Sequence, residues 1–150
     1  MKSPTFESFN EKWAQRMVGR VANKGIDGYL QLKVVEIKPG WLVCEMPVSD
    51  EILANTGNVH TGCLSVLCDH VLGTIMYPVM PTGHWATTTE YKINLVAPVT
   101  TGLCLARGQI MAMTERSATV QIQVENEDKL VAMAQGTCAI VPPAPRPMPT

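Results

Sequence analysis

The sequence lacks several features that mark whole classes of protein. It has no excess of either charge, with a formal net charge of -1, and no run of lysine or arginine. Nucleic acids and charged membrane surfaces are therefore not expected partners, because both are bound through clustered positive charge. It also has no internal repeat and no change of composition that marks a domain boundary.

The sequence also lacks paired cysteines, a secretory signal and an apolar segment long enough to span a membrane. The five cysteines are odd in number and include no C-x-x-C pair, which is typical of reduced thiols in a cytoplasmic protein. Residues 1–7 contain no apolar core of a secretory signal, so none is expected. The longest apolar-leaning stretch, 63–80, is interrupted by Asp69, His70 and Pro78, which argues against a membrane span.

The composition that is present favours one globular domain. A chain of 150 residues with 46% hydrophobic and 17% charged residues can bury a core without disulfides. We expect a single domain over residues 1–141. The proline-rich residues 142–150 cannot join a sheet and are expected to be an extended, mobile tail.

Hydrophobic periodicity predicts a helix and a hairpin in the first third of the chain. Apolar residues of the segment 6–21 recur at spacings of three or four, as on one face of a helix, and the stretch 23–28 ends it. Two β-prone runs, 29–37 and 41–46, flank a Pro39-Gly40 turn signal. These runs are expected to pair as antiparallel strands.

A second, longer helix is predicted from about His60 to Tyr77. Its apolar residues lie on more than one face, which is typical of a helix that is buried on nearly all sides. Gly62 and Gly73 within it would each cost about 1 kcal/mol unless close packing or a ligand compensates.

Four β-prone runs follow, at 85–96, 103–113, 118–124 and 130–141, separated by turn signals. Such runs predict an antiparallel meander. A curved antiparallel sheet wrapped around the single buried helix is the simplest way to cover that helix, so we expect an α+β fold. Its exposed edges favour pairing with a second copy of the chain.

The loop that leads into the long helix is a candidate anion-binding site. Residues 55–62 are rich in asparagine and glycine, and such a loop leaves backbone N–H groups unpaired at the positive end of the helix dipole. An ordinary capped helix is the alternative, and this segment alone favours it.

Asp69 stands in the middle of the apolar helix. Burial of a charge is costly, so such a residue is usually paired, placed at an interface or functional. A carboxylate in apolar surroundings is also a better base. The pattern leaves open both a functional and a structural hydrogen-bonding role.

From Asn55 to Ile140 the chain resembles the hotdog-fold acyl-CoA thioesterases of the phenylacetate-degradation and 4-hydroxybenzoyl-CoA type. The segment Gly57-Asn58-Val59-His60-Thr61-Gly62 is similar to the family's Gly-x-x-His-Gly-Gly. Asp69 follows the histidine by nine positions, where the family has its catalytic carboxylate. The segments 87–90, 98–102 and 130–137 resemble the family's later strands and turn.

This resemblance implies a hotdog fold, in which a long central helix is wrapped by a curved antiparallel sheet, here preceded by an N-terminal helix. It implies two protomers joined into one continuous sheet, often with dimers paired into tetramers, and active sites at the dimer interface. The implied reaction is hydrolysis of an acyl-CoA thioester to a carboxylic acid and a free thiol, with no cofactor and no metal.

The resemblance also implies roles for individual residues. The backbone N–H of Thr61, beside Gly62 at the helix start, would polarise the thioester carbonyl. Asp69 of the facing subunit would act as a base on water or as a nucleophile, and Thr88 would help to position it. The substrate-binding residues on this pattern lie in the loop before the helix: Asn55, Gly57 and His60.

Two departures from the family pattern keep other functions open. Thr61 replaces the first glycine after the motif histidine, and Ala54 stands six residues before that histidine, where the family has a polar residue. These departures favour, as an alternative, a non-catalytic acyl-CoA-binding or sensor module on the same fold. A dehydratase variant of the fold would instead depend on His60.

Other chemistries find less support in the sequence. His60, His70 and His84 with Asp69 match no zinc-ligand spacing, and the latter two histidines are expected to be loosely constrained. Ser65 lacks the G-x-S-x-G context of a serine hydrolase. No basic residue can be assigned to the phosphates of CoA.

Overall fold

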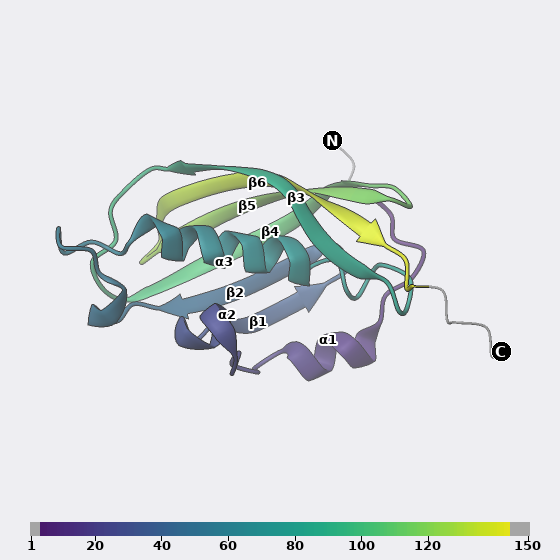
Figure 1. Cartoon of the computed structure of the whole chain (residues 1–150), viewed down its shortest axis with the longest axis horizontal. Helices are drawn as coiled ribbons and strands as arrows, with labels where there is room; N and C mark the ends of the chain where they lie inside the picture. The colour runs from purple at the N-terminus through teal and green to yellow at the C-terminus, as the bar shows by residue number, and fades with distance from the viewer. Residues whose placement is uncertain (1–3, 145–150) are drawn as a thin grey trace.

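The structure, a computed structural model, describes residues 4–144 (Figure 1). Most of the predicted mobile tail, from residue 145 onward, lies outside the described residues. Within residues 4–144, no helix is long and apolar enough to cross a membrane.

One sheet of six antiparallel strands curves around a long helix, as Figure 1 shows. This arrangement confirms the predicted α+β class with a helix wrapped by a sheet. The hairpin across Pro39-Gly40 is also confirmed. The strands are β1 (Lys33–Lys38), β2 (Trp41–Pro47), β3 (Trp85–Leu95), β4 (Leu103–Met113), β5 (Ser117–Asn126) and β6 (Lys129–Val141).

The predicted meander of the last four strands is wrong in the position of β3. The strand order is β1-β2-β4-β5-β6-β3, so β3 pairs with β6 and forms an edge of the sheet. Residues 98–102 are therefore a connection between distant strands and not a hairpin turn. Turn signals show where the chain reverses but do not identify the neighbouring strand, and β2 and β5 occupy both sides of β4.

The central helix α3 (Thr61–Thr74) packs closely on the concave face of the sheet. A Cβ atom at Gly108 of β4 would lie 2.5 Å from Cγ1 of Val71, and one at Gly136 of β6 would lie 3.0 Å from Cδ1 of Leu72. Both contacts are closer than real Cβ atoms normally tolerate. Gly108 therefore allows the helix to approach the sheet, whereas a side chain at Gly136 would first meet Cβ of Tyr91 and the carbonyl of Glu90 in β3.

The sheet covers only one side of α3. Leu67 and Val71 face it and are fully buried, whereas Thr61 and Asp69 are exposed on the other side. The predicted burial of the helix on nearly all sides is wrong for a single chain, and so is the burial of Asp69. Sequence periodicity does not distinguish a surface covered by the same chain from one that a second chain would cover.

The N-terminal segment forms two short helices instead of the predicted long one. Helix α1 (Glu11–Met17) begins where the Asn10 side chain accepts a hydrogen bond from the Trp13 N–H, at 3.0 Å. Helix α2 (Gly25–Tyr29) forms where a break was expected. Phe6 lies before α1 and its ring fills the space next to Gly40, so its apolar character reflects a contact with the hairpin.

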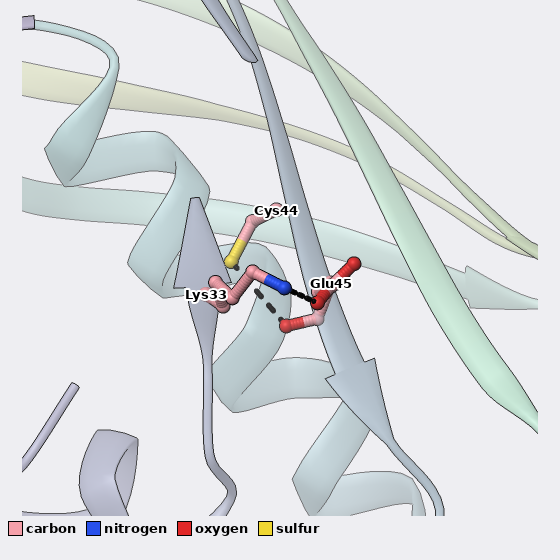
Figure 2. Close-up of polar contacts among 3 residues, drawn as sticks. All are labelled: Lys33, Cys44 and Glu45. Atoms are coloured by element: carbon pink, nitrogen blue, oxygen red, sulfur yellow. Dashed lines mark hydrogen bonds and ion pairs between the residues drawn. The ribbon is translucent and has the colours of Figure 1, made fainter. Parts of the chain in front are cut away.

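Strands β1 and β2 separate a polar outer face from the core (Figure 2). Nζ of Lys33 lies 2.5 Å from Oε1 of Glu45, its partner in the strand register. The preceding residue, Cys44, points to the opposite face and is completely buried. The ion pair therefore lies on the outer face of these two strands, and the cysteine lies on the core face.

The buried cysteines are neutral thiols. All five cysteines are free. Burial raises the pKa of Cys44 and of Cys68 from 9.0 to about 12, and that of Cys104 to about 11. Each thiol therefore retains its proton in the folded chain at a pH at which the unfolded chain has lost it.

We expect the free energy of unfolding to fall as the pH rises above 9, because only the unfolded state then releases these protons. Each strongly shifted thiol contributes at most about 1.4 kcal/mol per pH unit. Urea denaturation between pH 8 and 11 should show a shallower decline for Cys68→Ala than for the wild type. Cys63→Ala, at a half-buried position, is the control, and equal slopes for all three proteins would contradict the expectation.

Candidate active site

A pocket of about 420 Å³ lies at the start of α3, and we call it the helix-start pocket. It is enclosed by the loop 54–60, the first turn of the helix and the connection 95–99. Val59 N–H donates to Val99 O at 2.7 Å and holds the loop against the connection. The connection supplies an apolar wall, and the polar side chains come from the loop and the helix: Thr56, Asn58, His60 and Thr61.

His60 caps α3 and leaves one backbone amide open. Its Nδ1 accepts a hydrogen bond from the Gly62 N–H at 3.0 Å, and its carbonyl accepts one from the Cys63 N–H at 2.8 Å. Among residues 4–144, the Thr61 N–H donates to no backbone or side-chain acceptor. The open amide at the positive end of the helix is therefore that of Thr61, whereas the amide of Gly62 is occupied.

Asn55 and Gly57 do not border the pocket, and Gly57 shapes the loop. Gly57 has φ +78°, and its N–H donates to Ala54 O at 2.8 Å within a tight turn. This turn directs Thr56 and Asn58 to the pocket, and neither of them was singled out from the sequence. The motif gave no signal for them, because the turn geometry decides which side chains face inward.

A second hollow of about 360 Å³ lies between the later part of α3 and the start of β3, and we call it the Asp69 hollow. Its lining includes both Asp69 and Thr88. The Thr88 hydroxyl lies 3.8 Å from Sγ of Cys138, which itself donates to Leu72 O at 3.3 Å. Thr88 is thus anchored on its strand beside an exposed carboxylate.

The open amide and the carboxylate lie apart on one helix. Asp69 stands eight positions after Thr61, which corresponds to roughly 12 Å along the axis. The helix-start pocket and the Asp69 hollow share no lining residue. A donor to a carbonyl oxygen and a group that attacks its carbon must both lie within about 3.5 Å of the reacting atoms. One chain alone therefore cannot bring both groups to one carbonyl.

Two histidines differ from expectation. His70 is not loosely constrained, because its Nδ1 lies 3.1 Å from Oδ2 of Asp27 in α2. No local pattern indicates this pair, whose members are 43 positions apart. Nδ1 of His84 is buried and has no hydrogen-bond partner in the part of the chain that the structure describes. Over the same part, no group of three histidine, cysteine or acidic side chains is placed to hold a metal ion.

A curved antiparallel sheet around one long central helix is the hotdog fold. The chain belongs to the thioesterase superfamily, whose family model matches residues 56–133. The matched region includes Thr61, Asp69 and Thr88. Membership indicates thioester hydrolysis as the class of reaction.

Individual proteins are similar to this chain in sequence or in fold. A protein of Saccharolobus solfataricus whose name describes it as an esterase is 26% identical to this chain over 114 residues. The match covers 75% of this chain and 81% of that protein. A thioesterase of Haemophilus influenzae has a TM-score of 0.78 at 18% identity and covers 98% of this chain and 97% of its own. A variant of the phenylacetic acid degradation protein PaaI of Thermus thermophilus has a TM-score of 0.68 at 28% identity, covering 74% and 94%.

We expect His60→Ala to destabilise the protein by about 1 kcal/mol, since it removes the acceptor for the Gly62 N–H at the helix start. His60→Asn retains a capping oxygen at this position and should cost much less. Urea denaturation of the two variants measures the difference. Equal stabilities of His60→Ala and the wild type would contradict a capping role.

Proposed function

We propose that the protein hydrolyses acyl-CoA thioesters to a carboxylic acid and free CoA, at a site shared between two copies of the chain. One observation carries the proposal: the open Thr61 amide and the exposed Asp69 carboxylate lie about 12 Å apart on the uncovered side of one helix. Each is half of a hydrolytic site. Family membership supports the reaction class, and acyl-CoA is the substrate that the resemblance suggests.

The edge strand β3 supports pairing of two copies. It has 11 residues, one side of it has no partner strand, and Trp85 and Leu95 are 49% and 48% exposed. A long edge with exposed apolar side chains favours edge-to-edge pairing. A two-fold axis beside β3 would continue the sheet and reverse the direction of the partner's helix. The start of one helix would then approach Asp69 of the other.

Gly73 supports the same arrangement. It follows Asp69 by one helical turn and borders the Asp69 hollow, and a Cβ atom at this position would meet nothing within 4 Å in the single chain. A glycine inside a helix costs about 1 kcal/mol relative to alanine. Contact with a partner or with substrate at this open surface would compensate that cost.

The shared site would work by polarising the thioester and delivering an oxygen atom. The Thr61 N–H of one copy would donate a hydrogen bond to the carbonyl oxygen and stabilise its developing negative charge. Asp69 of the other copy would remove a proton from the attacking water or attack the carbonyl carbon itself. Thr88 would hold the carboxylate or the water in position from the neighbouring strand.

A binding module without turnover is the second candidate. Ala54 and Thr61 both border the helix-start pocket, at the two positions where the resemblance expects a polar residue and a glycine. The pocket is therefore apolar at one of these positions and narrowed by a side chain at the other. Ala54 removes a polar group that could orient the attacking water, and the Thr61 side chain reduces the room for a thioester.

The first test is release of CoA from a panel of aromatic and aliphatic acyl-CoA esters, separated by chromatography. We expect Asp69→Asn to reduce kcat by about 100-fold or more, because it removes the proton acceptor. Asp128→Asn, the same change in an exposed loop, should retain the wild-type rate. Binding of a CoA ester without turnover by the wild type would select the binding module.

The second test asks whether two chains share one site. Thr61→Pro removes the open N–H at the first helical position, which accepts proline, and His60 has the extended backbone, φ -59° and ψ 128°, that a following proline requires. Thr61→Pro and Asp69→Asn should each be inactive alone. When refolded together, random mixing yields one intact site in each mixed dimer and about one quarter of the wild-type rate.

No recovery in the refolded mixture would contradict a shared site. Thr61→Ala is the matched control, because it retains the N–H and changes only the side chain. It should remain active alone. Light scattering should show dimers or larger assemblies for all of these proteins.

A further inference from the structure

His70 borders the Asp69 hollow together with the candidate carboxylate, its neighbour in the sequence. The imidazole is only 13% exposed, and its Nδ1 faces Oδ2 of Asp27 at 3.1 Å. Asp27 belongs to α2, so the N-terminal segment determines the orientation of this ring. The hollow thus contains a carboxylate and an imidazole that is oriented by a second carboxylate.

Nε2 of His70 is available for proton exchange. It makes no hydrogen bond with any of residues 4–144, and it is not one of their buried polar atoms that lack a partner. It therefore has access to solvent. A carboxylate that accepts a hydrogen bond from Nδ1–H fixes the tautomer and leaves Nε2 as the nitrogen that gains and loses a proton.

The N-terminal segment holds a second ring of the same hollow. The rings of Trp13 and Tyr77 are stacked, with centroids 5.3 Å apart and planes at 16°. Tyr77 borders the Asp69 hollow, and the Asn10 N–H donates to Pro78 O at 2.7 Å beside it. Helices α1 and α2 therefore position two aromatic rings of the hollow from outside the region that the family model matches.

We propose that His70 is a second proton-transfer residue of this site and that Asp27 is its positioning residue; this inference rests on the proposed hydrolysis. A water oxygen bonds to the carbonyl carbon while Asp69 takes one of its protons. The carbon–sulfur bond then breaks, and the sulfur takes the proton from Nε2 of His70. The proton on Asp69 passes through water to Nε2, which restores both groups and leaves a carboxylic acid and a thiol.

The test compares two thioesters of one acyl group that differ in leaving group. An alkyl thioester such as the CoA ester leaves as a basic thiolate that benefits from a proton donor, whereas a thiophenyl ester leaves as a much weaker base. We expect His70→Gln to lower kcat/KM by about 100-fold on the CoA ester and by about fivefold or less on the thiophenyl ester. The ratio of variant to wild type on each substrate removes differences in binding.

Asp27→Asn should show the same dependence on leaving group with a smaller loss, since it retains His70 and loses only its orientation. This variant also tests the inference if His70→Gln does not fold. His84→Gln is the matched control, because His84 lies outside the Asp69 hollow, and it should leave both rates unchanged. Unfolding temperatures of the variants report any structural loss.

Equal losses on both esters for His70→Gln and Asp27→Asn would overturn the inference, because a structural role does not depend on the leaving group. Full activity of both variants would overturn it as well. If the wild type is active, Asp69→Asn is inactive and His70→Gln is normal, then only the role of His70 fails. A wild type that hydrolyses neither ester overturns the proposed function and this inference together.

Discussion

The close packing of helix α3 on β4 is the contact on which the candidate site depends. At Gly108 the helix side chain Val71 occupies the volume in which any other residue would place its Cβ atom, at 2.5 Å. Because protein interiors are densely packed, a side chain there would displace the helix as a unit. Thr61 at its start and Asp69 on its outer side would both move. The same contact therefore sets the position of the helix in the core and of the candidate site residues on it.

The sheet covers α3 on one side only, so the opposite side of this helix is exposed in a single chain. The sheet buries Leu67 and Val71 and leaves Asp69 in solvent, so the side of the helix that bears the carboxylate is free for another surface. The edge strand β3 is also free for another surface, since one row of its backbone N–H and C=O groups has no partner strand. The exposed face of α3 and the unpaired edge of β3 lie at the same side of the molecule, and a second chain could cover both. The sheet of one chain leaves one side of its central helix uncovered.

Local sequence patterns predicted where the helices and strands lie along the chain better than which strands pair in the sheet. The alternation on either side of Pro39-Gly40 predicted the β1–β2 hairpin, and the runs at 103–113 and 130–141 coincide with β4 and β6 to within a residue. The position of β3 beside β6 could not be predicted, because it depends on which edges the other strands leave open. In the site, the motif singled out Thr61, Asp69 and Thr88, which border the two hollows. It did not show that Gly57 forms a turn, or that Asp27 holds His70 across 43 positions.

The matched region and the N-terminal segment contribute to the Asp69 hollow in different ways, and this difference bears on substrate specificity. Residues 56–133 belong to the family and contain the helix start, the carboxylate and the strand hydroxyl. Asp27 and Trp13 lie before this region, and each holds one ring of the Asp69 hollow through a single contact. Changes in the N-terminal segment can therefore reshape the hollow without changing the packing of α3 on the sheet. The core positions the candidate carboxylate, and the segment before the matched region holds two of the rings that border it.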